Sequence, residues 1–255
     1  MPAVRIWRGD ACGNRLLLAV ADEASAALEA GEVRSLCRAQ SADGLLVLDP
    51  LSDPPRLAVR NRDGTDGGVC LNGARLAARW LERERGLAGG LLETGGRHLG
   101  WRRDPEERLV LLLPPESLPE EMALRPVDLG GGRRGLAVPW WNPHCVVPVE
   151  DVDAEDLETL AGRAAAAEAL FPEGVNLELV QDDGPGALRV RVHERGVGET
   201  GSCASGAVAV SLVAWMGGGP GPLELRFPGG SLRTRPGPEG SLLLQGPVRL
   251  EEAPL

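Results

Sequence analysis

The spacing of apolar residues along the chain predicts many short strands and few helices. Short apolar runs, each bounded by Gly, Pro, Asn, Asp or Arg, recur throughout the sequence and are typical of strands. In the first half of the chain the predicted strands are 5–7, 16–20, 44–48, 57–60, 91–93 and 109–113, with a turn at 95–96.

Longer periodic segments predict the helices. Segment 71–85 has apolar residues at helical spacing and is followed by Gly86, a residue favoured just after a helix end. Segments 24–38 and 154–170 are predicted as further helices. Segment 204–216 is apolar on nearly every side, which indicates a helix that is buried all round.

The second half of the chain repeats the order of elements found in the first half. Glu194 follows its predicted strand as Asn61 does, 133 residues earlier, and several other landmarks share an offset near 130. Chance recurrence in a chain with 35 glycines is the alternative, and the number of landmarks disfavours it. The predicted strands of this half are 145–147, 175–180, 188–192, 223–227 and 242–244.

This duplication predicts an α+β fold with two pseudo-symmetric lobes. Each lobe is expected to wrap a sheet around the one long helix of its half. The stretch 114–126 contains several prolines and is the best linker candidate. We therefore predict an N-terminal lobe at 1–117 and a C-terminal lobe at 118–255.

The clearest part of the repeat is a glycine-rich loop that ends in a cysteine where a helix begins. It reads Asp63-Gly-Thr-Asp-Gly-Gly-Val-Cys70-Leu-Asn-Gly-Ala74 in the first half and Gly196-Val-Gly-Glu-Thr-Gly-Ser-Cys203-Ala-Ser-Gly-Ala207 in the second. A cysteine at a helix N-terminus lies near unpaired N–H groups and the positive end of the helix dipole, which favours its thiolate. The same N–H groups can bind a carboxylate.

Two such loops related by pseudo-symmetry suggest a narrower chemistry than one loop would. A carboxylate held between two helix N-termini places its neighbouring carbon between two thiols. One thiolate can then remove a proton from one face while the other thiol delivers a proton to the opposite face. Reversal of stereochemistry at an amino-acid α-carbon needs this arrangement, so Cys70 and Cys203 are the predicted catalytic residues.

A hydrolase of the Cys-His type is the alternative enzyme class, with Cys203 as nucleophile and His144 as its base. It leaves the second cysteine loop unexplained. Cys12, Cys37 and Cys145 lack the glycine-rich context and are predicted to be ordinary buried cysteines.

Composition and charge exclude several other classes. All 27 basic residues are arginine, so Schiff-base pyridoxal phosphate chemistry and a Walker A loop, which both need lysine, are excluded. A net charge of −10 and the absence of a basic stripe argue against nucleic-acid binding. Five unclustered cysteines, no leader-like N-terminus and no long apolar run predict a reduced cytoplasmic protein without structural zinc or membrane contact.

With these motifs the chain resembles the diaminopimelate epimerase family over nearly its whole length. The most specific segments are 61–74, Asn142-Pro-His-Cys145, Phe171-Pro-Glu-Gly-Val-Asn176 and 191–207. The resemblance implies a cofactor-independent amino-acid epimerase of bacterial lysine and cell-wall biosynthesis. It also implies two α/β lobes with curved, mostly antiparallel sheets, no metal, and a homodimer.

The resemblance further implies the site residues. Cys70 and Cys203 match the acid/base pair, Arg195 matches the ligand of the distal substrate carboxylate, and Glu194 suits an ammonium group. A buried arginine without an anionic partner would be costly, so Arg195 also argues for a substrate with a second anion. The remaining expected substrate contacts are Asn14, Asn61, Leu71, Asn72, Gly73, Asn142, Asn176, Ala204 and Ser205, with Gly44, His144 and Gly206 near the site.

Three positions depart from the family pattern. Leu71 and Ala204 stand where the family has glycine after each cysteine, and Gly44 stands where many members have glutamine. The backbone N–H groups of Leu71 and Ala204 remain available if these residues have negative φ. The departures bear on substrate specificity. They leave open a related racemase for another amino acid, and a catalytically inactive relative that only binds.

Overall fold

The computed structural model describes residues 5–21, 28–118, 124–219 and 221–253. The chain divides into two compact units, residues 1–113 with 245–255, and residues 114–244. The predicted boundary of the C-terminal lobe at 255 is therefore wrong. The last strand, β17 (Arg249–Ala253), pairs antiparallel with β1 (Ile6–Ala11) and so belongs to the first unit.

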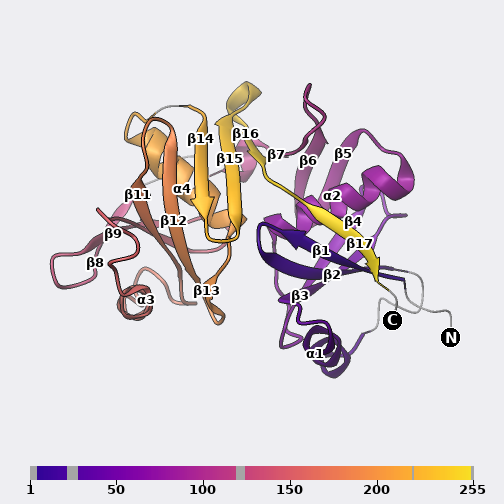
Figure 1. Ribbon diagram of the computed structural model, residues 1–255, viewed down its shortest axis with the longest axis horizontal. Coiled ribbons are helices and arrows are strands. Elements are labelled where there is room, and N and C mark those ends of the chain that lie inside the picture. The colour runs from indigo at the N-terminus through magenta and orange to yellow at the C-terminus, as the bar shows by residue number, and fades with distance from the viewer. Residues whose placement is uncertain (1–4, 22–27, 119–123, 220, 254–255) are drawn as a thin grey trace. The chain divides into compact units, whose positions relative to one another are not determined.

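The first unit contains one mixed sheet whose strands run in the order β17, β1, β2, β3, β4, β5, β6 and β7 (Figure 1). Two neighbouring pairs are parallel, β2 with β3 and β4 with β5, and each needs a crossover helix. Helix α1 (Ala30–Ala39) makes the first crossover and α2 (Leu71–Arg85) the second. The new strands are β2 (Asn14–Val20), β3 (Gly44–Asp49), β4 (Arg56–Asn61), β5 (Gly89–Thr94), β6 (Arg97–Arg103) and β7 (Leu109–Leu113).

Helix α2 is the centre of this unit, and the sheet curves around it. It contacts strands from β17 at one end of the sheet to β7 at the other. Its residues from Leu71 to Ala78 are all buried, and it ends at Gly86, whose φ of 65° is the left-handed conformation that glycine favours. The predicted bounds of this helix are confirmed.

The second unit repeats this plan. Strands β10 and β11 are parallel and joined through α3 (Leu157–Ala165), and β12 and β14 are parallel and joined through α4 (Ala204–Met216). The antiparallel pairs are β8–β9, β9–β10, β11–β12, β12–β13 and β14–β15. The strand bounds are β8 (Arg125–Asp128), β9 (Arg134–Val138), β10 (His144–Pro148), β11 (Asn176–Asp182), β12 (Ala187–Glu194), β13 (Gly198–Thr200), β14 (Leu223–Phe227), β15 (Gly230–Pro236) and β16 (Leu242–Gln245).

The repeat extends to strand register. Arg56 in β4 lies opposite Glu93 in β5, and Arg189 in β12 lies opposite Arg226 in β14. Both residues of the second pair follow those of the first by 133 positions. The duplication inferred from sequence landmarks is therefore a duplication of topology and pairing.

Alternation along the strands assigns each sheet face to a different helix. In β3, Leu45 joins the cluster beneath α1, and its neighbour Leu46 lies against Gly73 of α2. In β11, Leu177 joins the cluster beneath α3, and its neighbour Glu178 lies against Gly206 of α4. The equivalent position thus holds a leucine in one unit and a glutamate in the other.

Several elements differ from their prediction. Helix α1 begins at Ala30, and residues 24–27 of the predicted helix 24–38 lie outside the described residues. Helix α3 is shorter than predicted. Helix α4 is buried from Ala204 to Ser211, but Met216 at its end is 54% exposed, so the expectation of burial all round is wrong. The linker candidate includes a 3₁₀ turn, Pro115–Ser117, while its residues 119–123 lie outside the described residues.

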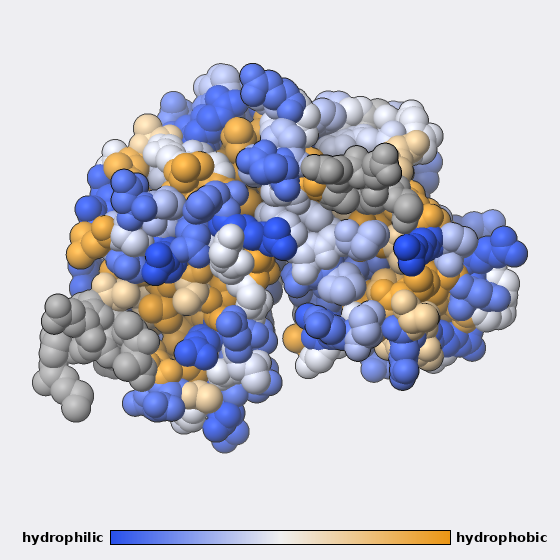
Figure 2. All heavy atoms as spheres, turned by 180° about the vertical axis from the view of Figure 1, so that it is seen from behind, coloured by the Kyte–Doolittle hydropathy of each residue, from blue (hydrophilic) through white to orange (hydrophobic). Residues whose placement is uncertain are grey.

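The surface in Figure 2 is mostly hydrophilic, with apolar residues in scattered patches. Among the described residues, the exposed large hydrophobic side chains are Leu51, Leu87, Leu91, Val197 and Met216. No helix in these residues combines the length and apolar character that crossing a membrane requires.

Candidate active site

Cys70 is the N-cap residue of α2. Its φ and ψ of −125° and 106° are extended, and its Sγ accepts a hydrogen bond from the backbone N–H of Gly73 at 3.3 Å. The thiol is half-buried. Leu71, Asn72 and Gly73 form the first turn of the helix, whose N–H groups have no partner within the helix itself.

Cys203 has the same relation to α4. Its φ and ψ are −124° and 115°, and its Sγ accepts from the backbone N–H of Gly206 at 3.4 Å. The Oγ of Ser205 lies 3.2 Å from this sulfur. Ala204 and Ser205 begin the helix as Leu71 and Asn72 begin α2. Each unit therefore presents a cysteine sulfur at the positive end of a helix whose first two turns are buried.

The two glycines after these cysteines are also required for packing. A Cβ built on Gly73 would lie 2.6 Å from Cδ2 of Leu46, and one built on Gly206 would lie 2.5 Å from Oε1 of Glu178. Each helix start therefore rests closely on the strand beneath it. The family-pattern glycines replaced by Leu71 and Ala204 are different positions, and both replacements are accommodated as buried helical residues.

The other expected contacts in the first unit lie at the ends of strands. Asn14 begins β2, and its Oδ1 is buried without a hydrogen-bond partner among the described residues. Asn61 ends β4, where its Nδ2 donates to Oγ1 of Thr65 at 3.0 Å and to the carbonyl of Asp66 at 3.2 Å. Gly44 lies between them in the sheet, since β3 pairs with both β2 and β4.

Asn72 is held by a buried arginine that sequence reasoning missed. Nη2 of Arg75 donates to Oδ1 of Asn72 at 2.6 Å, and Nη1 donates to the carbonyl of Pro247 at 3.3 Å. Arg75 is 0% exposed, one helical turn beyond the cysteine loop. A charged residue on a helix whose neighbours Ala74, Leu76 and Ala77 are apolar was the signal available in the sequence.

Asn176 and Glu194 belong to neighbouring strands of the second unit. Oδ1 of Asn176 accepts from the backbone N–H of Arg195 at 2.8 Å and so fixes the end of β12. Glu194 accepts a hydrogen bond from Oγ1 of Thr200 across the β12–β13 hairpin and also hydrogen-bonds Cys203. Asn142 is half-buried in the loop before β10.

His144 of β10 and Glu178 of β11 form a buried pair, and Glu178 lies against Gly206 in the first turn of α4. Nδ1 of His144 lies 2.7 Å from Oε1 of Glu178, and both side chains are fully buried. Nε2 of His144 and Oε2 of Glu178 have no hydrogen-bond partner within the described part of the chain. Glu178 was not predicted, although a charge between Leu177 and Leu179 in a central strand was visible in the sequence.

Burial and these carboxylates control protonation in the second unit. Burial raises the pKa of the Cys203 thiol well above its usual value, and the charges of Glu194 and Glu178 raise it further. Burial likewise raises the pKa of Glu194, against the hydrogen bonds from Thr200 and Cys203 that lower it. Cys203 is thus held as a thiol beside an acidic group.

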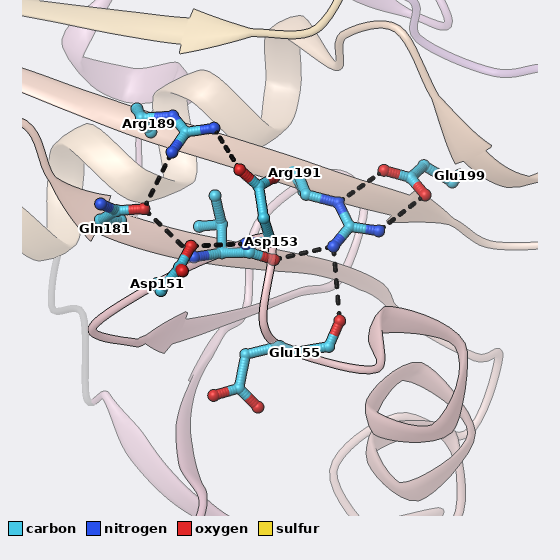
Figure 3. A network of polar contacts seen from close by, with 8 residues as sticks. Asp151, Asp153, Glu155, Gln181, Arg189, Arg191 and Glu199 are labelled. Carbon is cyan, nitrogen blue, oxygen red and sulfur yellow. Dashed lines mark hydrogen bonds and ion pairs between the residues drawn. The ribbon is translucent and has the colours of Figure 1, made fainter.

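A polar network supports the hairpin that carries Glu194 (Figure 3). Arg191 of β12 forms two hydrogen bonds to the carboxylate of Glu199 in β13, at 2.8 and 2.9 Å, and a third to the carbonyl of Val152 at 2.7 Å. Arg189 pairs with Asp153 at 2.7 Å. The hydrogen bonds from Arg191 lower the pKa of Glu199. Glu199, the acid four residues before the cysteine, therefore has a structural role.

Arg195 is not buried. Its side chain is 41% exposed, Nη1 donates to the carbonyl of Glu173 at 2.6 Å, and the carboxylate of Glu173 lies 3.9 Å away. The expectation that this arginine is buried without a partner is wrong, because the hairpin end that carries it faces solvent. The burial of Arg195 therefore no longer supports the inference that the substrate has a second anion.

Comparison with known proteins agrees with this architecture. The profile of the family described as diaminopimelate epimerase matches residues 137–250. The diaminopimelate epimerase of Xanthomonas euvesicatoria is 36% identical over 74% of this chain and 71% of its own length. That of Acidothermus cellulolyticus is 33% identical over 92% of this chain and 90% of its own length.

Solved structures show the same fold at low sequence identity. A predicted epimerase from Pseudomonas aeruginosa matches with a TM-score of 0.72 at 19% identity, over 99% of both chains. A probable proline racemase from Agrobacterium radiobacter matches with a TM-score of 0.67 at 12% identity, over 99% of this chain and 93% of the other. The chain is an enzyme of the epimerase kind, and it belongs to the diaminopimelate epimerase family.

Proposed function

We propose that the protein interconverts the LL and meso forms of diaminopimelate, in lysine and cell-wall biosynthesis, by proton transfer between Cys70 and Cys203. The observation that carries this proposal is the matched geometry of the two cysteines. Each is the N-cap of a helix whose first two turns are buried, and each accepts a hydrogen bond from the N–H three residues later. Curated relatives named diaminopimelate epimerase support the choice of substrate.

The proposed reaction needs no external acid or base. The substrate α-carboxylate accepts hydrogen bonds from the first-turn N–H groups of the helices. A thiolate at one cysteine removes the α-proton and becomes a thiol, while the electron pair stays on the substrate as a carbanion. The thiol of the other cysteine then protonates the opposite face and becomes a thiolate. The inverted product leaves with the proton positions exchanged between the two sulfurs.

Incubation of the protein with a panel of amino acids in deuterated water tests this proposal. We expect deuterium at the α-carbon of diaminopimelate and inversion at that centre. Cys70→Ala and Cys203→Ala should each abolish inversion without loss of fold. A variant that kept a tenth of wild-type kcat, a loss of only about 1.4 kcal/mol in transition-state stabilisation, would contradict the two-thiol mechanism.

A racemase for another amino acid is the second candidate. Gly44, which cannot contribute a side-chain contact, and the exposed Arg195 favour it. Faster labelling of a monocarboxylic amino acid than of diaminopimelate would establish this candidate. Absence of labelling with every amino acid would establish a binding protein without catalysis.

We further propose that the protein forms homodimers, as the resemblance to its family implies, and acts without a metal or organic cofactor. Light scattering coupled to size exclusion should give twice the chain mass of 26.9 kDa. Activity should survive exhaustive treatment with a chelator.

A further inference from the structure

Buried charges of opposite sign accompany the two cysteine helices. The duplication makes the comparison direct, because positions in α2 and α4 correspond at an offset of 133. Arg75 in α2 therefore corresponds to Val208 in α4, and both are fully buried. By strand register Glu178 in β11 corresponds to Leu46 in β3, and each lies against the equivalent helix glycine. One unit has a buried cation where the other has a valine, and the other has a buried carboxylate where the first has a leucine.

Arg75 has no carboxylate partner in its surroundings. Among the described residues, no acidic side chain lies within ion-pair distance of its guanidinium, and its Nε has no hydrogen-bond partner. Its hydrogen bonds go to neutral groups, the side chain of Asn72, the carbonyl of Pro247 and the thiol of Cys12. A buried cation held only by neutral acceptors is costly, which indicates that an anion compensates it in the working enzyme.

The groups around Arg75 restrict the identity of that anion. Burial raises the pKa of the Cys12 thiol despite the nearby guanidinium, so Cys12 remains a neutral acceptor. Asp10 of β1 also acts on Arg75 but forms no ion pair with it among the described residues, and its Oδ1 accepts from the backbone N–H of Gly13 at 3.1 Å. Besides Cys12 and Asp10, Cys70, the N-cap residue of the helix that carries Arg75, is an ionisable group whose charge acts on the guanidinium. The interaction is mutual, so the guanidinium stabilises the Cys70 thiolate.

The surroundings of Cys203 have the opposite sign. Glu194 of β12 hydrogen-bonds its sulfur, and Glu178 of β11 lies beneath the first turn of its helix. His144 of β10 pairs with Glu178 at 2.7 Å, and Ser205 of α4 contacts the sulfur at 3.2 Å. No arginine of the described residues pairs with Glu194 or Glu178. A negative charge on Cys203 would thus face two acidic groups.

From these contacts we propose that Arg75 and Glu178 fix the proton distribution of the free enzyme, with Cys70 as the thiolate and Cys203 as the thiol. Both are positioning residues that act through the cysteines. The proposal rests on the proposed two-thiol function for its catalytic meaning. In this state the free enzyme can begin the reaction only with the substrate isomer whose α-proton faces Cys70. Turnover leaves Cys70 as the thiol and Cys203 as the thiolate, so a proton must return to Cys203 before the next turnover.

Site-resolved alkylation tests the assignment without any substrate. The free protein is treated with iodoacetamide across a pH series, and the modification of each cysteine is followed by peptide mass mapping. Because only the thiolate reacts, the midpoint of each profile reports ionisation of that sulfur, whatever its absolute rate. We expect the Cys70 midpoint to lie well below that of Cys203. A Cys203 midpoint at or below that of Cys70 would overturn the proposal.

Variants separate the two charges. Arg75→Val copies the equivalent Val208 and should raise the Cys70 midpoint by about one pH unit or more, while Arg75→Lys should largely restore it. Arg79→Val is the matched control, since it removes a positive charge from the same helix at a half-buried position paired with Glu82. Its Cys70 midpoint should equal that of the wild type. An equal shift of the Cys70 midpoint in Arg75→Val and Arg79→Val would show that only the net charge of the protein matters, which would contradict the proposal.

Glu178→Gln keeps the volume and the acceptor for His144 but removes the charge. It should lower the Cys203 midpoint and leave that of Cys70 unchanged. If Arg75→Val fails to fold, the order of the two midpoints in the wild type still tests which cysteine is the thiolate. The alkylation profiles of Arg75→Lys and Glu178→Gln then test the roles of the two charged residues. Absence of α-carbon labelling would refute the proposed function while leaving these midpoints intact, so the two failures are distinguishable.

Discussion

A Cβ built on Gly44 would lie 2.8 Å from the carbonyl oxygen of Arg60 and 3.2 Å from Cδ2 of Leu16. The first contact is with backbone, since Gly44 pairs with Asn61 across the β3–β4 ladder, so it cannot relax by a rotamer change. Any side chain here, including the glutamine that many family members have, must displace a strand. The glutamine side chain that many family members have here is therefore excluded by the sheet geometry around Gly44.

We therefore predict that Gly44→Gln fails to improve affinity for diaminopimelate and destabilises the protein by about 1–3 kcal/mol, the usual cost of overpacking. Urea unfolding and steady-state kinetics would measure the two effects. Gly162 is the matched control, because it lies inside α3 and a Cβ there meets no atom within 4 Å. Gly162→Ala should stabilise the protein by about 0.5–1 kcal/mol. A lower KM with unchanged stability in Gly44→Gln would contradict the packing argument.

A second prediction concerns Arg195 as the ligand of the distal substrate carboxylate. Arg195→Leu should lower kcat/KM for diaminopimelate by about 100-fold, the equivalent of one charged hydrogen bond of nearly 3 kcal/mol. Because Arg195 is exposed, stability should change by less than about 0.5 kcal/mol. Arg233→Leu, an exposed arginine of the same unit with only a 3.8 Å contact to Glu224, should leave kinetics unchanged. Equal losses in both variants would show a general effect of charge.

The duplication was readable from sequence because it is carried by local signals. Glycine-rich loops, the helix stop at Gly86 and the short apolar runs at 44–48 and 175–180 depend on neighbours in sequence. These signals located α2, α4 and both cysteine caps. The strands that escaped prediction, such as β6 and β15, are hairpin partners rich in arginine, whose assignment comes from pairing with β5 and β14.

Burial of charge could not be predicted in the same way. Arg195 has the family motif and is exposed, whereas Arg75 has no motif and is fully buried. The difference arises from long-range contacts, since Arg75 hydrogen-bonds Pro247 across 172 positions of sequence. Likewise β17 joins the first unit through its pairing with β1, a contact that no local pattern indicates. The burial of Arg75 and the place of β17 in the first unit therefore emerged only from the structure.

A third prediction concerns the network of Figure 3. Arg191→Met removes both hydrogen bonds to Glu199 and the bond to the Val152 carbonyl, so the β12–β13 hairpin loses its support beside Glu194. We expect a lower kcat with little change in KM, because the proton-transfer geometry at Cys203 depends on this hairpin. Arg189→Met loses only its contacts to Asp153 and Gln181 and should retain wild-type kcat. An unchanged kcat in Arg191→Met would show that the network is dispensable.

The same pair gives a pH dependence of stability. The pKa of Glu199 is lowered in the folded state by Arg191, so its stabilisation is present above the unfolded pKa and is lost as pH falls through the folded pKa. Glu199→Gln should therefore unfold more readily than the wild type at neutral pH and show a smaller loss of stability on acidification below about pH 4. Chemical denaturation at a series of pH values measures this. Parallel curves for the two proteins would contradict the assignment.

The final prediction concerns alkaline pH and the buried cysteines. Burial raises the pKa of Cys145 to about 12, with a smaller contribution from the charge of Glu178. Between the ordinary cysteine value of about 9 and this value, the unfolded chain has lost the proton while the folded chain keeps it. The folded state then binds more protons, so the free energy of unfolding must fall as pH rises, by about 1.4 kcal/mol per pH unit for each such cysteine.

Cys145→Ala should lower stability at pH 7 because it leaves a cavity among Val147, Leu177 and their neighbours. It should also flatten the decline above pH 9 relative to the wild type. Urea denaturation from pH 7 to pH 11 under reducing conditions separates the two effects, and a slope unchanged by the substitution would show that Cys145 ionises normally in the folded protein.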